Sequence, residues 1–259
     1  MTSFDLDQYR QLWKPRIDAA LSEILDGIGE GCPRVLREAM RHALLGGGKR
    51  LRPILCIAAA RACGGDEEAA LRPGCALEMI HAYSLVHDDL PAMDDDDVRR
   101  GQPACHKAFG EAAAILAGDA LLTHAFYVLA KSAPEAVAMV SEAAGPTGMV
   151  GGQVDDVRGA GPIESIHLRK TAAMFQAAVG LGGMVAGASD KPLQALAAYG
   201  RALGLAFQVA DDLLDQDGNQ QADPAVVGGL IQRAVDAIKP LGGKADALLA
   251  IAEFVKKRA

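Results

Sequence analysis

Two aspartate-rich segments lie far apart in a chain whose other residues are mostly apolar. The first runs from His87 to Asp97, and the second runs from Asp211 to Asp215. Carboxylates that are concentrated among apolar residues repel one another and lose hydration, so a counter-charge must bind near them. Divalent cations are the counter-charge best suited to such clusters. The two segments therefore predict a metal site to which both contribute.

The spacing of the carboxylates supports one shared site. At about 3.6 residues per turn, Asp211 and Asp215 lie on one face of a helix. Pro91 interrupts the helix of the first segment, so Asp88 and Asp94 can converge although they are not at simple helical spacing. All of these ligands are oxygens with no nearby His/Cys pair, which favours Mg²⁺.

A solvated acidic loop is the alternative interpretation of these aspartates. We favour it for residues 95–97 considered alone. Apolar residues flank four other aspartates, for which we favour the metal interpretation: Asp88, Asp89, Asp211 and Asp215.

The composition excludes several classes of protein. Half of the 259 residues are hydrophobic and only 4% are aromatic, a balance that favours helix over strand. No linker divides the chain, so we expect one domain over residues 1–259. The net charge of −7 argues against a nucleic-acid partner or an anionic-membrane surface.

The cysteines and the first residues indicate a compartment. The five cysteines show no C-x-x-C spacing, and their odd number fits reduced core thiols. The N-terminus is acidic rather than typical of a signal peptide, and no uninterrupted apolar run reaches the roughly 20 residues that span a bilayer. We therefore expect a cytoplasmic protein without a membrane span.

Helical periodicity recurs between short glycine and proline breakers. The expected helices cover residues 5–28, 35–45, 52–63, 66–87, 111–131, 134–144, a long stretch after 166, and 193–215. Asp66 is the expected N-cap of the fourth helix. Alternation typical of strands is nowhere sustained. The pattern predicts an all-α helical bundle around a central cavity.

A basic segment opens the third expected helix. The glycines at 46–48 allow backbone amides to approach an anion, and Lys49 and Arg52 can present cations to the same side. Arg99 and Arg100 follow the first acidic segment and offer guanidinium donors to phosphate. The alternatives are a turn with solvated bases and simple compensation of the aspartate charges.

Acidic residues for metal and basic residues for phosphate together predict a substrate that carries a diphosphate. The apolar wall of the expected cavity implies that the other end of the substrate is apolar. Nucleotide hydrolysis fits less well, because the chain has no G-x-x-x-x-G-K-[ST] motif and no βαβ pattern.

The motifs resemble those of the trans-isoprenyl diphosphate synthases, and most closely those of bacterial farnesyl diphosphate synthases. Three segments carry the resemblance: Gly47–Pro53, His81–Gly101 and Phe207–Asp215. Weaker matches lie at Gly118–Leu121, Gly152–Gln153 and Lys170–Thr171. Because the matches run in order over most of the chain, the resemblance is specific.

The resemblance implies an isoprenoid-synthase-type fold and a head-to-tail prenyl transfer. An allylic diphosphate ionises, and the double bond of isopentenyl diphosphate attacks the carbocation. Mg²⁺ ions would neutralise the leaving diphosphate as Lewis acids. The implied metal ligands are Asp88, Asp94, Asp211 and Asp215, with Asp89 as a candidate support. The residues expected to act in catalysis are Asp88, Asp94, Lys170 and Asp211.

The same resemblance assigns the two diphosphates. The residues expected to hold the allylic diphosphate are Arg99, Lys170 and Gln208, with Thr171 nearby. The residues expected to hold isopentenyl diphosphate are Lys49, Arg52, His81 and Arg100. Outside these motifs, His81 would be interpreted as a partly buried core residue and Lys170 as a solvent-facing one. The family also implies a homodimer.

The residues one turn before Asp88 bear on product length. Tyr83 is bulky enough to close the cavity, whereas Ser84 is not. Together with the two extra residues Pro91–Ala92, Tyr83 resembles the pattern of C15-forming enzymes. The expected product from dimethylallyl or geranyl diphosphate is therefore farnesyl diphosphate. Geranylgeranyl diphosphate is the alternative, because Tyr83 as ordinary core packing is compatible with both.

The chain departs from the family pattern in two places. Family members continue after the second acidic segment through a loop with G-K and K-x-T, whereas Gln216–Asp223 carries no lysine. The stretch from Val157 to His167 is also short. Either flexible surface loops are absent from this sequence, or the chain has lost part of a lid. We favour the first explanation, because the motif carboxylates are intact.

Two other classes of protein stay open. The missing lysines are compatible with a non-catalytic synthase-like subunit that binds a partner synthase. An all-α terpene cyclase would share the ionisation chemistry, but it would not need Lys49 and Arg52 for a second diphosphate.

Overall fold

The structure is a computed structural model that describes residues 4–215 and 223–258. The α-helices are α1 (Leu6–Asp26), α2 (Arg34–Leu45), α3 (Leu51–Ala62), α4 (Leu71–Asp88), α5 (Cys105–Phe109), α6 (Glu111–Ser132), α7 (Val137–Ala144), α8 (Met149–Val157), α9 (Ile163–His167), α10 (Ala173–Val185), α11 (Asp190–Asp215), α12 (Pro224–Ile238) and α13 (Asp246–Lys256). A π-helical segment covers Leu168–Ala172, and short 3-10 segments cover Pro134–Ala136 and Lys239–Ala245. Two-residue strands, β1 (Val98–Arg99) and β2 (Gln102–Pro103), form an antiparallel hairpin.

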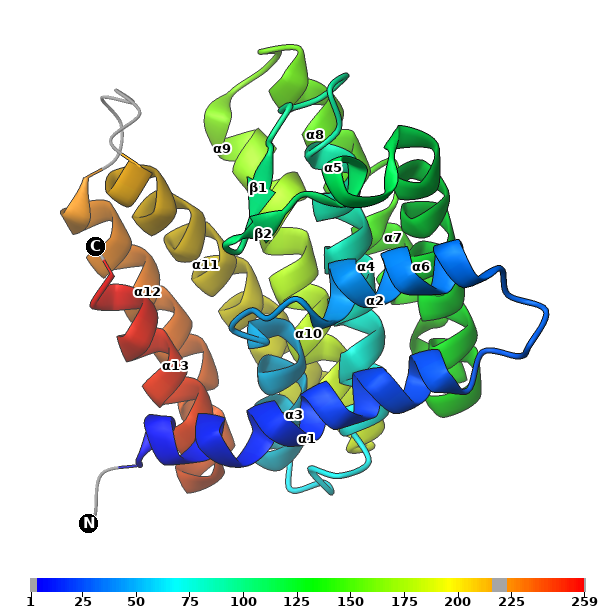
Figure 1. Cartoon of the computed structure of the whole chain (residues 1–259). Helices are drawn as coiled ribbons and strands as arrows, with labels where there is room; N and C mark the ends of the chain where they lie inside the picture. The colour runs from blue at the N-terminus through cyan, green and yellow to red at the C-terminus, as the bar shows by residue number, and fades with distance from the viewer. Residues whose placement is uncertain (1–3, 216–222, 259) are drawn as a thin grey trace.

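The helices pack around a central group formed by α3, α4 and α10 (Figure 1). Helix α6 covers α4, and α11 lies between α10 and α12. Figure 1 shows α12 and α13 beyond α11 on one flank and α1 running across the bundle. The prediction of an all-α bundle is confirmed.

Helices α3 and α10 approach each other closely at the centre of the bundle. Nine of the twelve residues of α3 are buried, and Gly182 of α10 lies against the carbonyl of Cys56. A Cβ at position 182 would lie 2.0 Å from that carbonyl oxygen, so only glycine fits there. The alanine- and glycine-rich composition therefore permits a closer helix contact than larger side chains would allow.

The predicted helix boundary at Asp66 is wrong. Asp66 accepts a hydrogen bond from the backbone N–H of Glu68 at 3.0 Å within a turn, and α4 begins only at Leu71. Two effects place the first residue of α4 later than the sequence predicted. Pro73 is tolerated only in the first turn of a helix, and Glu67 accepts a hydrogen bond from the hydroxyl of Tyr9 in α1 at 2.6 Å. The tertiary contact therefore holds the turn in place.

A buried ion network fixes the loop between α2 and α3. The guanidinium of Arg50 donates to Glu78 at 3.0 Å, to Asp18 at 2.7 Å and to the carbonyl of Leu44 at 2.9 Å. Arg50 is only 2% exposed and has a positive φ of 51°. Loss of the guanidinium would leave Glu78 as an unpaired buried charge, which is strongly destabilising. The network therefore positions the loop that carries Lys49.

One described helix, α6, is long and apolar enough to cross a membrane by length and composition alone. It has 22 residues, and 39% of its most apolar 18-residue window is buried inside the structure. Its inner face packs on α4 and α2, as a core helix does. All five cysteines are free thiols, but the prediction of core thiols fits only Cys56, Cys75 and Cys105, which are buried, whereas Cys32 and Cys63 are partly exposed.

Candidate active site

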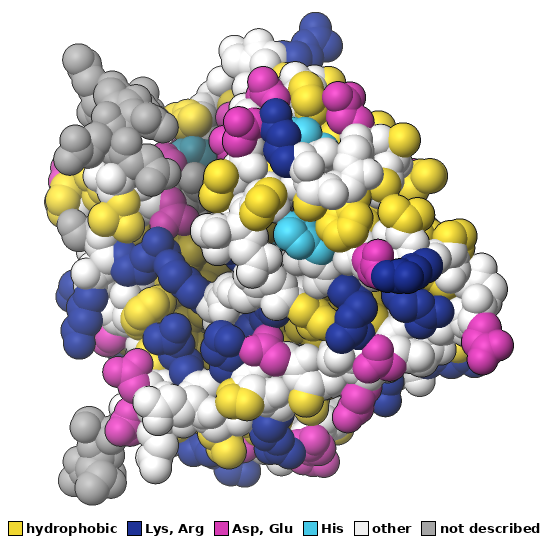
Figure 2. Space-filling model, in the orientation of Figure 1, with side chains coloured by type: hydrophobic (Ala, Val, Ile, Leu, Met, Phe, Trp, Pro, Cys, Tyr) yellow, Lys and Arg dark blue, Asp and Glu magenta, His cyan; other side chains and the backbone are white. Residues whose placement is uncertain are grey.

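A cavity of about 840 Å³ lies among α3, α4, α8 and α11. Figure 2 shows Lys and Arg side chains around a hollow between α11 and the β1–β2 hairpin, with Asp and Glu side chains above it. Asp88 at the end of α4 and Asp211 in α11 both line this cavity, although they are 123 positions apart in the sequence. The structure thus brings the two aspartate-rich segments together.

Asp88 is held in an environment that disfavours its charge. Burial raises the pKa of Asp88 to about 6, and the negative charges of Asp94 and Asp89 act in the same direction, whereas Lys170 opposes them. The backbone N–H of Asp94 donates to the carbonyl of Asp88 at 2.8 Å. Asp94 itself is exposed and lies just outside the cavity lining. A cation near these carboxylates would relieve their repulsion.

Asp211 has a cationic partner that the sequence did not suggest. Arg258, which follows α13, donates to a carboxylate oxygen of Asp211 at 2.6 Å and stacks on the ring of Phe207 at 4.8 Å. The segment that follows α13 therefore contacts two residues that line the cavity, Asp211 and Phe207. Asp215 is the last residue of α11, but its side chain lies outside the described part of the structure, as do residues 216–222.

Four cationic or titratable side chains line the opposite part of the cavity: Lys49, Arg52, His81 and Arg100. Burial lowers the pKa of every one of them. Neighbouring positive charges contribute in each case, such as Arg52 and Arg100 acting on His81. Nε of Arg52 has no hydrogen-bond partner among the described residues. This group of cations is therefore suited to an anion that would neutralise it.

The glycine triplet helps to position one of these cations. Arg100 donates to the carbonyl of Gly47, and its guanidinium lies against Gly48. Gly48 has a φ of 123°, and a Cβ there would lie 2.9 Å from Cζ of Arg100. The triplet therefore makes room for a guanidinium, in addition to bringing Lys49 to the cavity.

Arg99 is held in place by two aspartates of the first acidic segment. It donates to Asp89 through Nε at 2.8 Å and to Asp96 through Nη2 at 2.7 Å. The side chain of Asp89 is only 3% exposed. Hydrogen bonding to Asp89 raises the pKa of Arg99, so the guanidinium remains charged. Asp89 supports the site by orienting Arg99, which lines the cavity.

A local π-helix presents Lys170 and Thr171 to the cavity. Such segments are rare and are frequent at functional sites. Nζ of Lys170 lies 2.5 Å from a carboxylate oxygen of Asp156. The hydroxyl of Thr171 donates to Gln208 at 2.8 Å, and the amide of Gln208 donates to Asp212 at 2.9 Å. The chain of hydrogen bonds fixes Gln208, which also lines the cavity.

The remaining wall of the cavity is apolar and comes from α4 and α8. Tyr83 and Ser84 line it from α4, and the Tyr83 ring packs edge-on against His87 with a centroid distance of 5.7 Å. Three valines of α8 face them, at positions 150, 154 and 157. Sequence reasoning gave these valines no role, although their spacing of four and three residues is the signal of one helix face.

Gln153 of α8 also faces the cavity. Both polar atoms of its amide are buried and have no hydrogen-bond partner among the described residues. A buried amide without partners is costly, so a bound molecule with polar groups would satisfy it. The sequence marked Gln153 only as part of a weak motif.

Comparison with known proteins agrees with this site. The sequence model of polyprenyl synthetase matches residues 33–228. The chain belongs to the polyprenyl synthetase family. Members and relatives of this family are prenyltransferases of isoprenoid biosynthesis, and the prediction of a prenyltransferase is confirmed.

The individual relatives differ in product. The chain is 42% identical over 243 residues to farnesyl diphosphate synthase of Geobacillus stearothermophilus, covering 88% of the chain and 81% of that protein. It is 48% identical over 202 residues to heterodimeric geranylgeranyl pyrophosphate synthase large subunit 1 of Arabidopsis thaliana, covering 71% of the chain and 54% of that protein. A crystal structure of an FPP/GFPP synthase from Zymomonas mobilis superposes with a TM-score of 0.90, at 38% identity over 97% of this chain and 98% of that one. The isoprenoid-synthase-type fold is thereby confirmed.

The raised pKa of Asp88 predicts a stability cost in the metal-free protein. Above pH 6 the folded chain holds an ionised carboxylate that is more stable in the unfolded chain, where the pKa is 3.8. We expect Asp88→Asn to raise the free energy of unfolding by about 1–3 kcal/mol at pH 8. The gain should shrink as the pH falls through 6 toward 4, because the folded wild-type chain then takes up the proton. Urea unfolding in the presence of a chelator, at pH 8 and at pH 4, measures this difference in the free energy of unfolding.

Asp119→Asn is the matched control, since this carboxylate lies on the exposed side of α6 and the substitution removes the same charge. It should change stability by less than about 0.5 kcal/mol. A destabilised Asp88→Asn at pH 8 would contradict the assigned environment.

Proposed function

We propose that this prenyltransferase condenses isopentenyl diphosphate with dimethylallyl or geranyl diphosphate in the presence of Mg²⁺, and that farnesyl diphosphate is the product. One observation supports the proposal above the others. A single cavity combines repelling carboxylates, an incompletely neutralised group of cations and an apolar wall. A substrate pair with two diphosphates and hydrocarbon tails complements all three.

The cations form the proposed isopentenyl diphosphate subsite. Burial, and then neighbouring positive charges, lower the pKa of Lys49, Arg52, His81 and Arg100, so an anionic group among them would be bound strongly. Arg52 and Arg100 provide planar donors that match phosphate oxygens in pairs. The diphosphate would give Nε of Arg52 the partner that it lacks among the described residues.

The carboxylates form the proposed metal subsite. Asp88 and Asp211 offer hard oxygen donors at the same cavity, with Asp94 beside Asp88, and this donor set fits Mg²⁺. Asp215 belongs to the proposed set, although its side chain is outside the described residues. Bound Mg²⁺ would supply Lewis-acid neutralisation of the leaving diphosphate.

Side chains of the protein orient the allylic substrate in this proposal. Lys170 lies close enough to Asp88 to lower its pKa, and Arg99 is held at the cavity by Asp89. Both would bind the allylic diphosphate, and Thr171 and Gln208 would complete its contacts. The valines of α8 exclude water from the carbocation and keep the two hydrocarbon tails together. We assign the final proton to the released diphosphate.

Tyr83 is the proposed floor of the product cavity. It is 6% exposed, lines the cavity and lies more than one helical turn before Asp88. A tail that grows from the metal subsite along α4 would meet its ring. Geranylgeranyl diphosphate is the alternative product, since a relative of similar identity bears that name.

A non-catalytic subunit is the second candidate function. The observation in its favour is that residues 216–223, the last of which precedes Pro224, include no lysine. Such a chain would bind diphosphates without elongating them.

We also propose a homodimer, which is the oligomeric state typical of the family. We place the contact between its two copies at α6. Its outer face presents Ile115, Leu116 and Tyr127, which are 44%, 58% and 57% exposed. Tyr127 follows Leu116 by eleven residues, which is close to three full turns, and Ile115 is adjacent to Leu116. The three side chains therefore fall on one side of the helix. A twofold contact would bury them against the same face of a second copy.

The elongation assay tests the proposed function. With Mg²⁺, radiolabelled isopentenyl diphosphate and dimethylallyl diphosphate, the wild-type chain should form extended allylic products. Asp88→Asn should lower kcat at least about 10²-fold, since it removes stabilisation of the leaving group. Arg52→Met should mainly raise KM for isopentenyl diphosphate.

Arg34→Met is the control for the arginine change, because Arg34 is exposed in an ion pair on α2. Undiminished turnover by Asp88→Asn would overturn the metal assignment. Binding of both diphosphates without elongation would favour the non-catalytic subunit, and a cyclic hydrocarbon from one allylic substrate would identify a cyclase.

Product analysis tests the role of Tyr83. Tyr83→Ala should shift the main product from C15 to C20 or longer, because the ring no longer closes the cavity. Ser84→Ala, a neighbouring change in the same lining, should leave the C15 product unchanged. An unaltered product from Tyr83→Ala, in a chain with a native circular dichroism spectrum, would exclude Tyr83 as the floor.

Light scattering coupled to gel filtration tests the dimer. Leu116→Glu should convert the protein to a monomer, since a carboxylate would be buried without a partner in the contact. Leu12→Glu on α1, where Leu12 is 55% exposed, should leave the dimer intact. A dimer that survives Leu116→Glu would place the interface elsewhere.

A further inference from the structure

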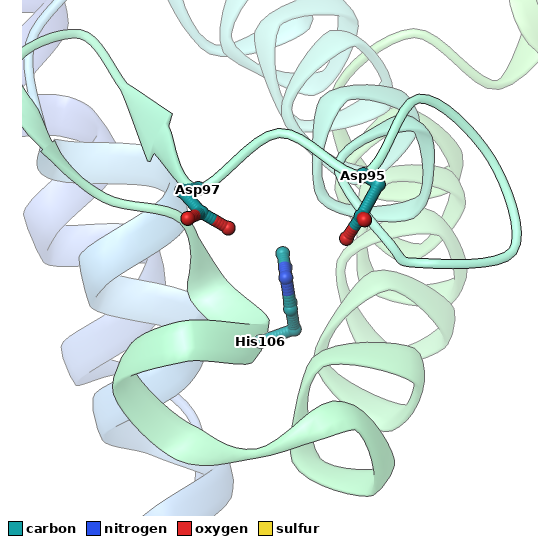
Figure 3. A group of neighbouring side chains, drawn as sticks. All are labelled: Asp95, Asp97 and His106. Atoms are coloured by element: carbon teal, nitrogen blue, oxygen red, sulfur yellow. The ribbon is translucent and has the colours of Figure 1, made fainter.

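Three side chains with metal-ligating atoms meet outside the cavity, beside the loop that follows α4. Asp95 and Asp97 belong to the first acidic segment, and His106 belongs to α5. One ligand atom from each lies within 4.8 Å of the other two. Figure 3 shows the imidazole rising from α5 between the two carboxylates, which point toward the space above it. Neither the substrate cavity nor its lining includes these three residues.

His106 is an independent indication that something binds there. It is only 6% exposed, and neither of its ring nitrogens has a hydrogen-bond partner among the described residues. A neutral imidazole has one donor and one acceptor, and an unsatisfied buried group costs about 1–3 kcal/mol. Protein structures rarely tolerate this cost without a partner. A cation beside the ring would give one nitrogen the partner that it lacks.

The two carboxylates have the charge and the freedom that a metal site requires. Ligand atoms bound at about 2.1 Å to one tetrahedral ion are about 3.4 Å apart, whereas the present ligand atoms lie within 4.8 Å of one another. Both aspartates are exposed, so rotation of their side chains can close this difference. Nζ of Lys107 lies 2.6 Å from one carboxylate oxygen of Asp97. The second oxygen of Asp97 can still bind an ion.

We propose that Asp95, Asp97 and His106 bind a first-row divalent cation, with Zn²⁺ as the best match, at a site separate from the substrate cavity. One imidazole nitrogen and two carboxylate oxygens, completed by water, suit Zn²⁺ in a tetrahedral arrangement. The imidazole disfavours Mg²⁺, which prefers oxygen ligands. The site therefore selects a different ion from the one proposed for the diphosphates.

The position of the site indicates what the ion does. The loop between α4 and β1 carries Asp94 and leads directly to Arg99, whereas His106 sits on α5 beyond the hairpin. An ion held by all three ligands would cross-link the loop to α5. It would therefore order the loop that carries Asp94 and leads to Arg99 at the cavity, and it would stabilise the folded chain by binding it selectively.

Calorimetric titration of the full chain with Zn²⁺ tests the proposal. The titration is made in excess Mg²⁺ and without diphosphate. Mg²⁺ then competes with Zn²⁺ for the carboxylates of the cavity. We expect one Zn²⁺ per chain and a rise in the melting temperature. Asp95→Asn, an exposed change that should not disturb folding, should weaken Zn²⁺ binding at least about 10-fold and abolish the rise in melting temperature. His106→Gln should do the same.

Asp88→Asn is the matched control, because it removes a carboxylate of the cavity and leaves the three proposed ligands intact. It should bind Zn²⁺ as the wild-type chain does. The proposal is overturned if the wild-type chain binds no Zn²⁺ in excess Mg²⁺, or if Asp95→Asn retains full affinity. It is also overturned if Asp88→Asn loses the binding, since the ion would then occupy the cavity. None of these results depends on prenyl transfer.

Discussion

The unfavourable electrostatics of one cavity govern the rest of this structure. Buried carboxylates repel one another on one side, and partly buried cations repel one another on the other. Each group would be more stable in water, so the fold must hold both in place against that preference. Several cations pair with carboxylates, as Arg258 does with Asp211, but the pKa of Asp88 stays raised and the pKa of Arg52 stays lowered. A site that is costly when empty is well suited to a charged substrate and its metal ions.

Rigid elements near the cavity supply the restraint. Arg50 and its buried carboxylate partners hold the loop between α2 and α3, and Asp89 holds Arg99 by two hydrogen bonds. The π-helical segment directs Lys170 and Thr171 inward. In each case a neighbouring group fixes the position of a residue that lines the cavity. The proposed Zn²⁺ site would add a similar restraint to the loop after α4, with an ion as the fixing group.

The same arrangement explains why the apolar composition is compatible with a polar site. Small residues in α3 and α10 allow close helix packing at the centre. The carboxylates of the cavity lie toward the ends of helices instead, with Asp88 at the end of α4 and Asp211 in the last part of α11. The valines of α8 are exposed to the cavity rather than to a packed neighbour. The hydrocarbon end of the proposed substrates would meet this wall while their diphosphates remain among the charges.

The sequence alone determined the helical class, the approximate limits of the longer helices as far as α11, and the family, because helical periodicity and motif spacing are local properties. It also identified the two carboxylate segments and the cations at 49, 52, 99 and 100, since charge among apolar residues is visible without a structure. Only the tertiary structure paired Arg258 with Asp211, placed α8 at the cavity and brought His106 between Asp95 and Asp97. It also moved the start of α4 to Leu71, through Tyr9. These contacts join residues that are distant in sequence or lie on different elements, so no local pattern encodes them, and packing of the whole chain decides them.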